Sequence, residues 1–344
     1  MKWKVSMKHG AEMGFFAWAR ALAGLFAAVA VLAPLLAAPA LGAEVGGEGV
    51  VRVLCLKGPT GMGLARLMEE AEAGRTENRY EFQLAASPED LTARFVQGAA
   101  DVVAMPSNMA AILWNRTQGG VRVLSASTLG VLAIVEKGES IHGMGDLRGR
   151  TILASGRGAS PEYVLNFLLR SNGLEPGTDC KVEWLSEHAA VVAGLAAGKG
   201  DAALLPHPFV EVAAMKVKGL REALDLTEEW RRLDLGSELV MAVNAAGRDY
   251  VDSHDAEVAA FLREARSSAE WVNAHPAEAA RLIVKHGVLE NAGIAERAIP
   301  RCSITALAGT EMQRALSGYL KVLFDADPRS VGGVLPDETF YYAR

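Results

Sequence analysis

The 344-residue sequence has only three cysteines, Cys55, Cys180 and Cys302, and they lie far apart. This spacing gives neither a disulfide framework nor the ligand pattern of a zinc site. Cys55 lies within the apolar run VVRVLCLK, which favours a buried structural thiol. We therefore expect at most one disulfide, even in an oxidising compartment.

The sequence also lacks a long run of basic residues. Lys and Arg number 35 and Asp and Glu number 41, which gives a formal net charge of -6. Sequence-independent nucleic-acid binding needs clustered cations that displace counterions from phosphates. Scattered charges of both signs are instead typical of a solvated surface, so we expect no nucleic-acid partner.

Motifs of common catalytic and nucleotide-binding sites are missing as well. The segment GPTGMG (Gly58–Gly63) is not followed by the Lys-Ser/Thr of a phosphate-binding loop, and GRGAS lacks the acidic residue of a dinucleotide fingerprint. No Gly-x-Ser-x-Gly, paired-carboxylate or His-x-x-x-His pattern is found. We therefore expect no enzyme activity, no cofactor and no metal site.

The N-terminal segment has the features of an export signal. Lys2, Lys4, Lys8 and Arg20 precede an Ala- and Leu-rich apolar stretch that ends in small residues before Glu44. This order is typical of a secretory signal peptide, predicted here as residues 1–43 and cleaved from the exported protein. The alternative is a retained, membrane-tethered anchor, although the apolar stretch before Pro34 is shorter than the ~20 residues a span needs.

From Val50 onward, short apolar runs alternate with amphipathic segments. Such alternation predicts α/β architecture, with a parallel sheet flanked by helices. Ser87 and Ser160, each followed by proline, are expected as helix N-caps. The expected strands are 50–57, 80–86, 101–106, 121–128, 130–138, 150–155, 180–185, 201–206 and 237–244. The expected helices are 63–74, 87–98, 107–118, 160–173, 188–198, 207–219, 255–275, 276–287, 290–299 and 310–326.

One pattern occurs twice, about a hundred residues apart. DVVAMPSNM (Asp101–Met109) and DAALLPHPF (Asp201–Phe209) both follow a glycine-containing helix end and both run from Asp through an apolar stretch to Pro. Two copies at this distance indicate a duplicated lobe, because solenoid repeats are shorter and more numerous. The duplication aligns His207 with Ser107.

Ligands of open α/β sheets bind beyond the carboxyl ends of the strands, near helix N-termini that offer free N–H groups. Five segments should lie there: GPTGMG, PSN, STLG, SGRGAS and PHP. Their Ser, Thr and Asn residues can equally be ordinary N-caps when each is taken alone. Together, these neutral donors predict a binding cleft between lobes more than a catalytic centre.

The segments KGPTGMGLARLM, FVQGAADVVAMPSN, ASGRGASPEYVLNFLLRSNGL and LAAGKGDAALLPHPFV together resemble substrate-binding proteins of ABC importers. The resemblance is to the nitrate, sulfonate and taurine and the pyrimidine-precursor (thiamine) group, over about residues 50–325. It implies a type II periplasmic-binding-protein fold with two α/β lobes joined by two crossing strands, STLGVLAIV and GSELVMAVN. The first lobe would comprise 44–130 and 238–344, and the second 131–237.

The resemblance implies a monomeric periplasmic protein that delivers a small organic ligand, neutral or anionic, to an ABC permease with its ATPase. Alternatives are a TRAP-type solute receptor and a same-fold enzyme such as a chorismate dehydratase-like lyase. Arg157 is the only charged residue in the five segments listed above, so the cationic clamp of nitrate or bicarbonate binders is missing. We expect the SGRGAS backbone to hold the ligand's anionic end. The predicted ligand-binding residues are Thr60, Gly61, Met62, Ser107, Asn108, Ser127, Thr128, Arg157, Gly158, Ala159, Ser160 and His207.

Overall fold

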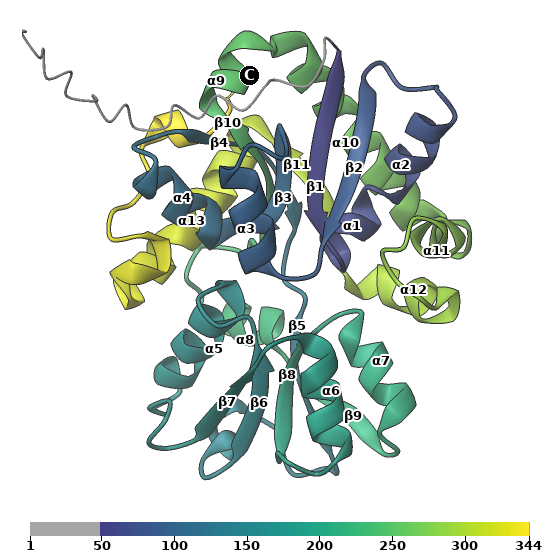
Figure 1. Ribbon diagram of the computed structural model, residues 1–344. Helices are drawn as coiled ribbons and strands as arrows, with labels where there is room; N and C mark the ends of the chain where they lie inside the picture. The colour runs from purple at the N-terminus through teal and green to yellow at the C-terminus, as the bar shows by residue number, and fades with distance from the viewer. Residues whose placement is uncertain (1–48, 344) are drawn as a thin grey trace, which may run out of the picture. The chain divides into compact units, whose positions relative to one another are not determined.

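The computed structural model describes residues 49–343, and the expected signal segment lies outside them. The described chain forms two β-sheets with helices packed against them, as Figure 1 shows. We call each sheet with its helices a lobe. Among these residues, no helix is both long and apolar enough to span a membrane.

The first lobe contains a six-stranded sheet in the order β11-β4-β10-β3-β1-β2. Its strands are β1 (Val50–Leu56), β2 (Arg79–Ala85), β3 (Val102–Pro106), β4 (Val121–Thr128), β10 (Ala242–Gly247) and β11 (Ile304–Ala308). Strands β2, β1 and β3 are parallel, whereas β10 is antiparallel to both of its neighbours and β11 is antiparallel to β4. The sheet is therefore mixed: the expected parallel pairing holds for β2, β1 and β3, and β10 and β11 run in the opposite direction.

The second lobe contains a five-stranded sheet in the order β7-β6-β8-β5-β9. Its strands are β5 (Leu132–Lys137), β6 (Thr151–Ser155), β7 (Lys181–Leu185), β8 (Ala202–Pro206) and β9 (Leu220–Asp225). Again three strands are parallel, and β5 runs antiparallel to β8 and β9. Each lobe thus has one strand, β10 or β5, that enters from the other lobe and runs against its neighbours.

The helices cover both faces of the sheets. Those with first-lobe strands on either side in sequence are α1 (Pro59–Gly63), α2 (Ala65–Glu72), α3 (Pro88–Val96) and α4 (Ser107–Arg116). The C-terminal part adds α9 (Arg248–Ser253), α10 (Asp255–Ala274), α11 (Pro276–Lys285), α12 (Ala292–Ala298), the short helix η2 (Ile299–Arg301), α13 (Gly309–Ala326) and η3 (Pro328–Val331). The second lobe has α5 (Ser160–Ser171), α6 (His188–Ala196), α7 (Phe209–Lys216) and α8 (Leu226–Arg232). Phe261, Tyr319 and Trp230 are fully or nearly fully buried between these layers.

Several expected elements need correction. Strands β9 and β11 were not predicted, and the helix expected at 63–74 is two helices that begin at Pro59. The return strand begins at Ala242, not at Ser237, because the preceding residues pass between the sheets. There Met241 donates its N–H to Thr128 O at 2.9 Å and accepts from Ser107 N at 3.2 Å. The lobe boundaries at 130/131 and 237/238 stay a prediction.

The duplicated Asp has the same backbone role in each lobe. Asp101 accepts from the Arg52 N–H at 2.8 Å, and its own N–H donates to Arg52 O at 2.9 Å. Asp201 repeats this exchange with Thr151, at 2.7 Å and 2.9 Å. The repeated Asp therefore fixes the start of β3 against β1 and the start of β8 against β6.

Candidate functional site

The two lobes meet at a corner built from α4 and α5. The Asn108 side chain donates to Gly158 O at 3.2 Å and accepts from the Ser160 hydroxyl at 3.1 Å. Ser107 Oγ lies 3.5 Å from Ser160 Oγ and donates to Val240 O. Ser107, Asn108 and Ser160 are all fully buried. These three predicted site residues are therefore brought together, and we call them, with Gly158, the neutral corner.

Ser160 was expected to cap its own helix, and that expectation was wrong. Ala159 is the N-cap residue of α5, and Ser160 is the first helical residue. Its hydroxyl donates instead to Asn108 in the other lobe. The sequence around Ser160 does not reveal this partner. Ser87, in contrast, does cap α3 by accepting from Asp90 N at 3.2 Å.

The SGRGAS turn already uses two of its backbone donors. Gly158 N–H donates to the Glu162 carboxylate at 2.6 Å, and Ala159 N–H donates to Gly156 O at 3.1 Å. A ligand anion at this turn would therefore compete with Glu162. Arg157 is exposed, and within residues 49–343 it forms no ion pair or side-chain hydrogen bond.

The GPTGMG turn is also largely internal. Thr60 is 6% exposed and its hydroxyl donates to Leu56 O at 2.9 Å. A side chain at Gly61 would meet Leu56 O at 2.9 Å, so a close approach of the backbone explains this glycine. Met62 is fully buried in the core cluster under β1, and its N–H donates to Gly58 O at 2.9 Å. We therefore leave Met62 out of the proposed site.

Ser127 and Thr128 are different, because their hydroxyls are buried without a partner. The two residues end β4, where the chain passes from the first sheet to the second, and they are 8% and 2% exposed. Within the described part of the chain, Ser127 Oγ and Thr128 Oγ1 have no hydrogen-bond partner. An unpaired buried hydroxyl costs about 1–3 kcal/mol, so such groups call for an explanation.

His207 lies at the second-lobe counterpart of Ser107, and it contacts carboxylates. Its N–H donates to Val131 O at 3.0 Å, much as Ser107 N–H donates to Met241 O. Its side chain is nearly buried, with Nδ1 2.7 Å from Glu211 Oε1 and Nε2 3.5 Å from Glu222 Oε2. Burial alone would lower the pKa of His207, but these two carboxylates outweigh burial and raise the pKa to about 9. Both ring nitrogens of His207 thus contact carboxylates, and neither is free for the ligand contact predicted from the sequence.

A second histidine, which sequence reasoning treated only as part of a helix start, lies at the same strand ends. His188 Nδ1 is 2.7 Å from the Ser155 hydroxyl, and its ring packs on Phe209 with centroids 4.6 Å apart. These residues follow β7, β6 and β8, three neighbouring parallel strands. Desolvation lowers the pKa of His188 to about 4, so the ring is neutral near pH 7. The signal in the sequence was a His three residues after the end of a strand, which is too common a pattern to single out.

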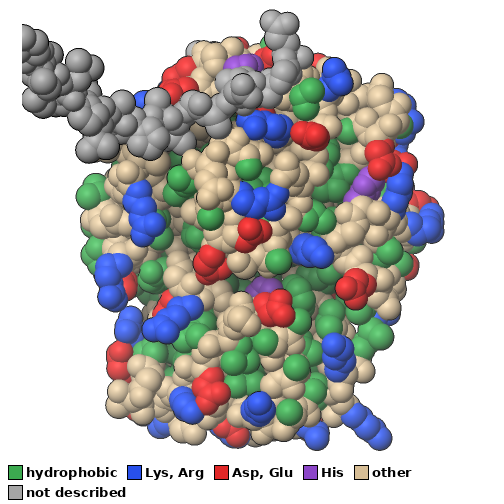
Figure 2. Space-filling view, viewed as in Figure 1, with side chains coloured by type: hydrophobic (Ala, Val, Ile, Leu, Met, Phe, Trp, Pro, Cys, Tyr) green, Lys and Arg blue, Asp and Glu red, His purple; other side chains and the backbone are tan. Residues whose placement is uncertain are grey.

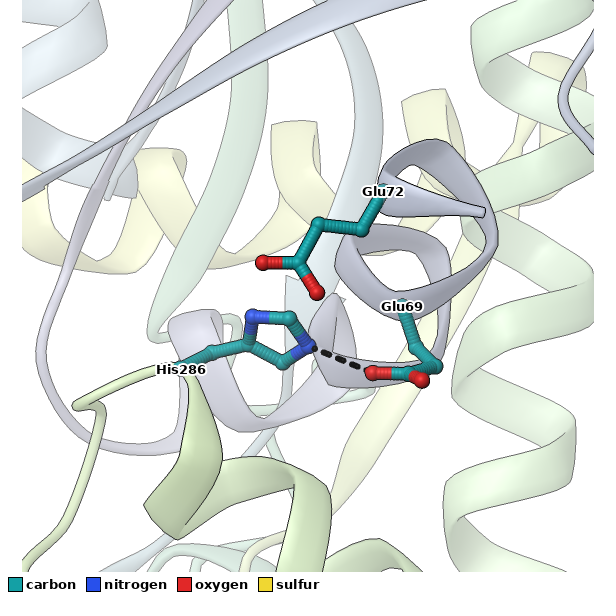
Figure 3. A group of neighbouring side chains, drawn as sticks. All are labelled: Glu69, Glu72 and His286. Carbon is teal, nitrogen blue, oxygen red and sulfur yellow. Dashed lines mark hydrogen bonds and ion pairs between the residues drawn. The ribbon is translucent and has the colours of Figure 1, made fainter. Parts of the chain in front are cut away.

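One group of described side chains approaches the geometry of a cation site. Glu69, Glu72 and His286 place their ligand atoms within 4.8 Å of one another, as Figure 3 shows. The Lys285 ammonium, however, lies 2.5 Å from Glu69 Oε2 and 2.6 Å from Glu72 Oε2. The charge of these carboxylates is thus compensated by lysine, and the group is an ion-pair cluster joining α2 to the end of α11.

The visible face of the molecule carries charges of both signs, interspersed over both lobes (Figure 2). A nucleic-acid interface would place cations along one stripe. This face has no such stripe, in agreement with the scattered charge of the sequence.

Comparisons with known proteins agree on one class. The family model described as "ABC transporter, phosphonate, periplasmic substrate-binding protein" matches residues 64–235, half of the chain. No curated protein matches the sequence.

Among solved structures, an ABC transporter protein from Parabacteroides distasonis has 23% identity and a TM-score of 0.73, over 86% of this chain and all of the other. The periplasmic aliphatic sulphonate binding protein SsuA from Escherichia coli has 18% identity and a TM-score of 0.67, over 85% of this chain and 95% of the other. The alkanesulfonate-binding protein SsuA from Xanthomonas axonopodis pv. citri, bound to MOPS, has 16% identity and a TM-score of 0.65, over 85% and 96%.

Proposed function

Because the chain belongs to the family of periplasmic substrate-binding proteins of ABC transporters, we propose that its cleft binds a small organic oxoanion through neutral donors. The family and the bilobal type II fold predicted from the sequence are confirmed. As the substrate-binding component of an ABC importer, the protein binds a small solute for a permease and its ATPase. Nothing in the comparisons favours a TRAP-type receptor or a lyase.

The proposal depends above all on the unpaired hydroxyls of Ser127 and Thr128. A sulfonate or phosphonate oxygen would accept from both, and a hydrogen bond to a charged group stabilises by about 1.5–3 kcal/mol. The names of the similar proteins support this ligand class, since the family description says phosphonate and two of the solved structures are named for sulfonates.

His188 would supply a donor from the second lobe. When Ser155 donates to Nδ1, the ring proton resides on Nε2 and can be donated to an anionic oxygen. Since the pKa of His188 is lowered to about 4, the imidazole would bind as a neutral donor. The Phe209 ring beside it offers apolar surface to an organic substituent. In the described residues no carboxylate contacts His188, so the Ser155–His188 pair does not extend to a catalytic triad.

Arg157, Gly158 and Ala159 remain proposed contacts on the same lobe. Arg157 is exposed and unpaired among the described residues, so its guanidinium is available to a ligand, whereas Glu162 limits access to the Gly158 N–H. We further propose that the exported protein acts as a periplasmic monomer without enzyme activity. The signal segment on which export depends lies outside the described residues.

The first test identifies the ligand. A thermal-shift screen of the purified protein would include alkanesulfonates, alkylphosphonates, carboxylates and pyrimidines. A ligand at 100 times its Kd adds about 2.7 kcal/mol to the unfolding free energy, which is easily detected. Stabilisation by carboxylates or pyrimidines alone would contradict the oxoanion proposal.

The second test removes one hydroxyl without changing side-chain volume. Thr128→Val should weaken binding of the identified ligand by about 10- to 150-fold, while leaving the ligand-free protein equally or more stable, since an unpaired buried hydroxyl is lost. Thr92→Val is the matched control, because the Thr92 hydroxyl donates to Pro88 O within α3. Calorimetry that finds parental affinity in Thr128→Val would remove the central support of the proposal.

A further inference from the structure

The two lobes are joined at two seams, one on either side of the crossing segments. At one seam α5 contacts α4 and α13, and it contains the neutral corner. At the other seam α7 contacts α12 (Figure 1), and β9 is joined to η2 by the Glu222–Arg301 contact. This second seam is charged, and the proposed ligand-binding groups do not include its ion pairs.

The central contact of the charged seam is between Glu222 and Arg301. Arg301 ends η2 in the first lobe, and one of its terminal nitrogens lies 2.5 Å from Glu222 Oε1 on β9 of the second lobe. The same nitrogen lies 3.9 Å from Asp225 Oδ2. Arg301 and His207 also line a common hollow of about 220 Å³ together with Gly130, Val131 and Leu132 of the first crossing segment. The ion pair therefore bridges the lobes beside the segment about which they would rotate.

The other oxygen of Glu222 is held from within the second lobe. His207 Nε2 lies 3.5 Å from Glu222 Oε2, while His207 Nδ1 is bound to Glu211. His207 is 4% exposed, so its ring is fixed in place. A carboxylate held on one oxygen loses less side-chain entropy when its second oxygen pairs across a seam.

We propose that Glu222 and Arg301 form an interlobe clasp, positioned by His207, that favours the closed arrangement of the lobes independently of ligand. The pKa of Glu222 supports the ionised state that this requires: burial would raise it, but His207 and Arg301 outweigh burial and lower it. The clasp requires that η2 and β9 separate when the lobes open, so that the free energy of the ion pair is gained only in the closed state, which is the condition for shifting a population.

Pairs of nitroxide labels can measure the closed fraction in the full chain without any ligand. Glu89 and Glu187 are exposed, and each lies at a helix start, on α3 and before α6. The native cysteines are buried, so labels would attach to Glu89→Cys and Glu187→Cys alone. Distance distributions from pulsed electron resonance then give the ratio of closed to open molecules.

Glu222→Gln and Arg301→Gln should each lower the closed-to-open ratio about two- to fivefold, the range expected for one partly exposed ion pair. The double variant should equal the single variants, because the same contact is lost. Arg297→Gln is the control, since Arg297 lies in the same seam and, within residues 49–343, its side chain forms no ion pair and donates to the Met215 sulfur at 3.7 Å. Unchanged distances in both single variants, or additive effects in the double variant, would overturn the clasp. Because no ligand is present, neither outcome depends on the proposed function.

Discussion

Ser107 and His207 occupy the same place in a duplicated lobe, yet their surroundings differ in charge. The Ser107 corner is neutral and hydrogen-bonded across the lobes through Asn108 and Ser160. The His207 corner is charged and held by Glu211 and Glu222. The two lobes share a backbone hydrogen bond at this position, Ser107 N–H to Met241 O in one and His207 N–H to Val131 O in the other. Because this contact does not involve the side chain, the side chains can differ in charge.

The repeated Asp gives the largest expected contrast between the lobes. Asp101 is 7% exposed and also pairs with the Arg52 guanidinium at 2.6 Å, whereas Asp201 is exposed and binds only backbone. Asp101→Asn should lower the unfolding free energy by about 3 kcal/mol, because it leaves a partly buried cation without its anion. Asp201→Asn keeps a carbonyl acceptor and should cost under about 0.5 kcal/mol.

Urea unfolding of both variants and the parent measures this contrast. Equal losses would mean that the two copies contribute through their shared backbone contacts alone. A larger loss in Asp201→Asn than in Asp101→Asn would contradict the energetic ranking of the two lobes.

The two histidines at the strand ends of the second lobe should give stability profiles of opposite sign. The folded-state pKa of His207 is raised from 6.5 to about 9, so its contribution is full below pH 6.5 and is lost as the pH rises through 9. At full strength this amounts to roughly 3 kcal/mol. The folded-state pKa of His188 is lowered to about 4, so stability is lost there as the pH falls from 6.5 to 4.

Unfolding free energies of parent, His207→Gln and His188→Gln between pH 4 and pH 10 test these signs. Relative to the parent, His207→Gln should flatten the alkaline side of the profile and His188→Gln the acid side. If His207→Gln leaves the alkaline slope unchanged, the carboxylates do not hold a protonated imidazole.

Arg157 should have the smallest effect on stability. Since it is exposed and unpaired among the described residues, Arg157→Ala should change the unfolding free energy by less than about 0.5 kcal/mol. The variant should nevertheless bind the identified oxoanion less tightly, with a binding free energy weaker by about 1.5–3 kcal/mol if the guanidinium contacts the charged group. Parental affinity by calorimetry would limit the anion site to the uncharged donors.

The sequence by itself determined most of the order of elements, the duplicated lobe and the family. The apolar run VVRVLCL predicts a buried strand, and Ser87-Pro88 predicts a helix start. Both predictions hold because apolar patterning and N-capping depend on a few neighbouring residues. The repeated Asp-to-Pro segment likewise indicated the duplication, although the matching backbone contacts of Asp101 and Asp201 join residues 49 and 50 positions apart.

Only the tertiary structure decided which of the predicted site residues are paired with other protein groups and which are not. Ser160 bonds to Asn108, 52 residues away, instead of capping its helix, and His207 meets Glu222 instead of a free cleft. The burial of the Ser127 and Thr128 hydroxyls without a partner, which Ser330 shares among the described residues, is likewise a tertiary feature. Strand β11 is only five residues long and is held by its antiparallel pairing with β4, a strand nearly 180 residues earlier in the chain. Each of these outcomes depends on partners distant in sequence, which no local pattern encodes.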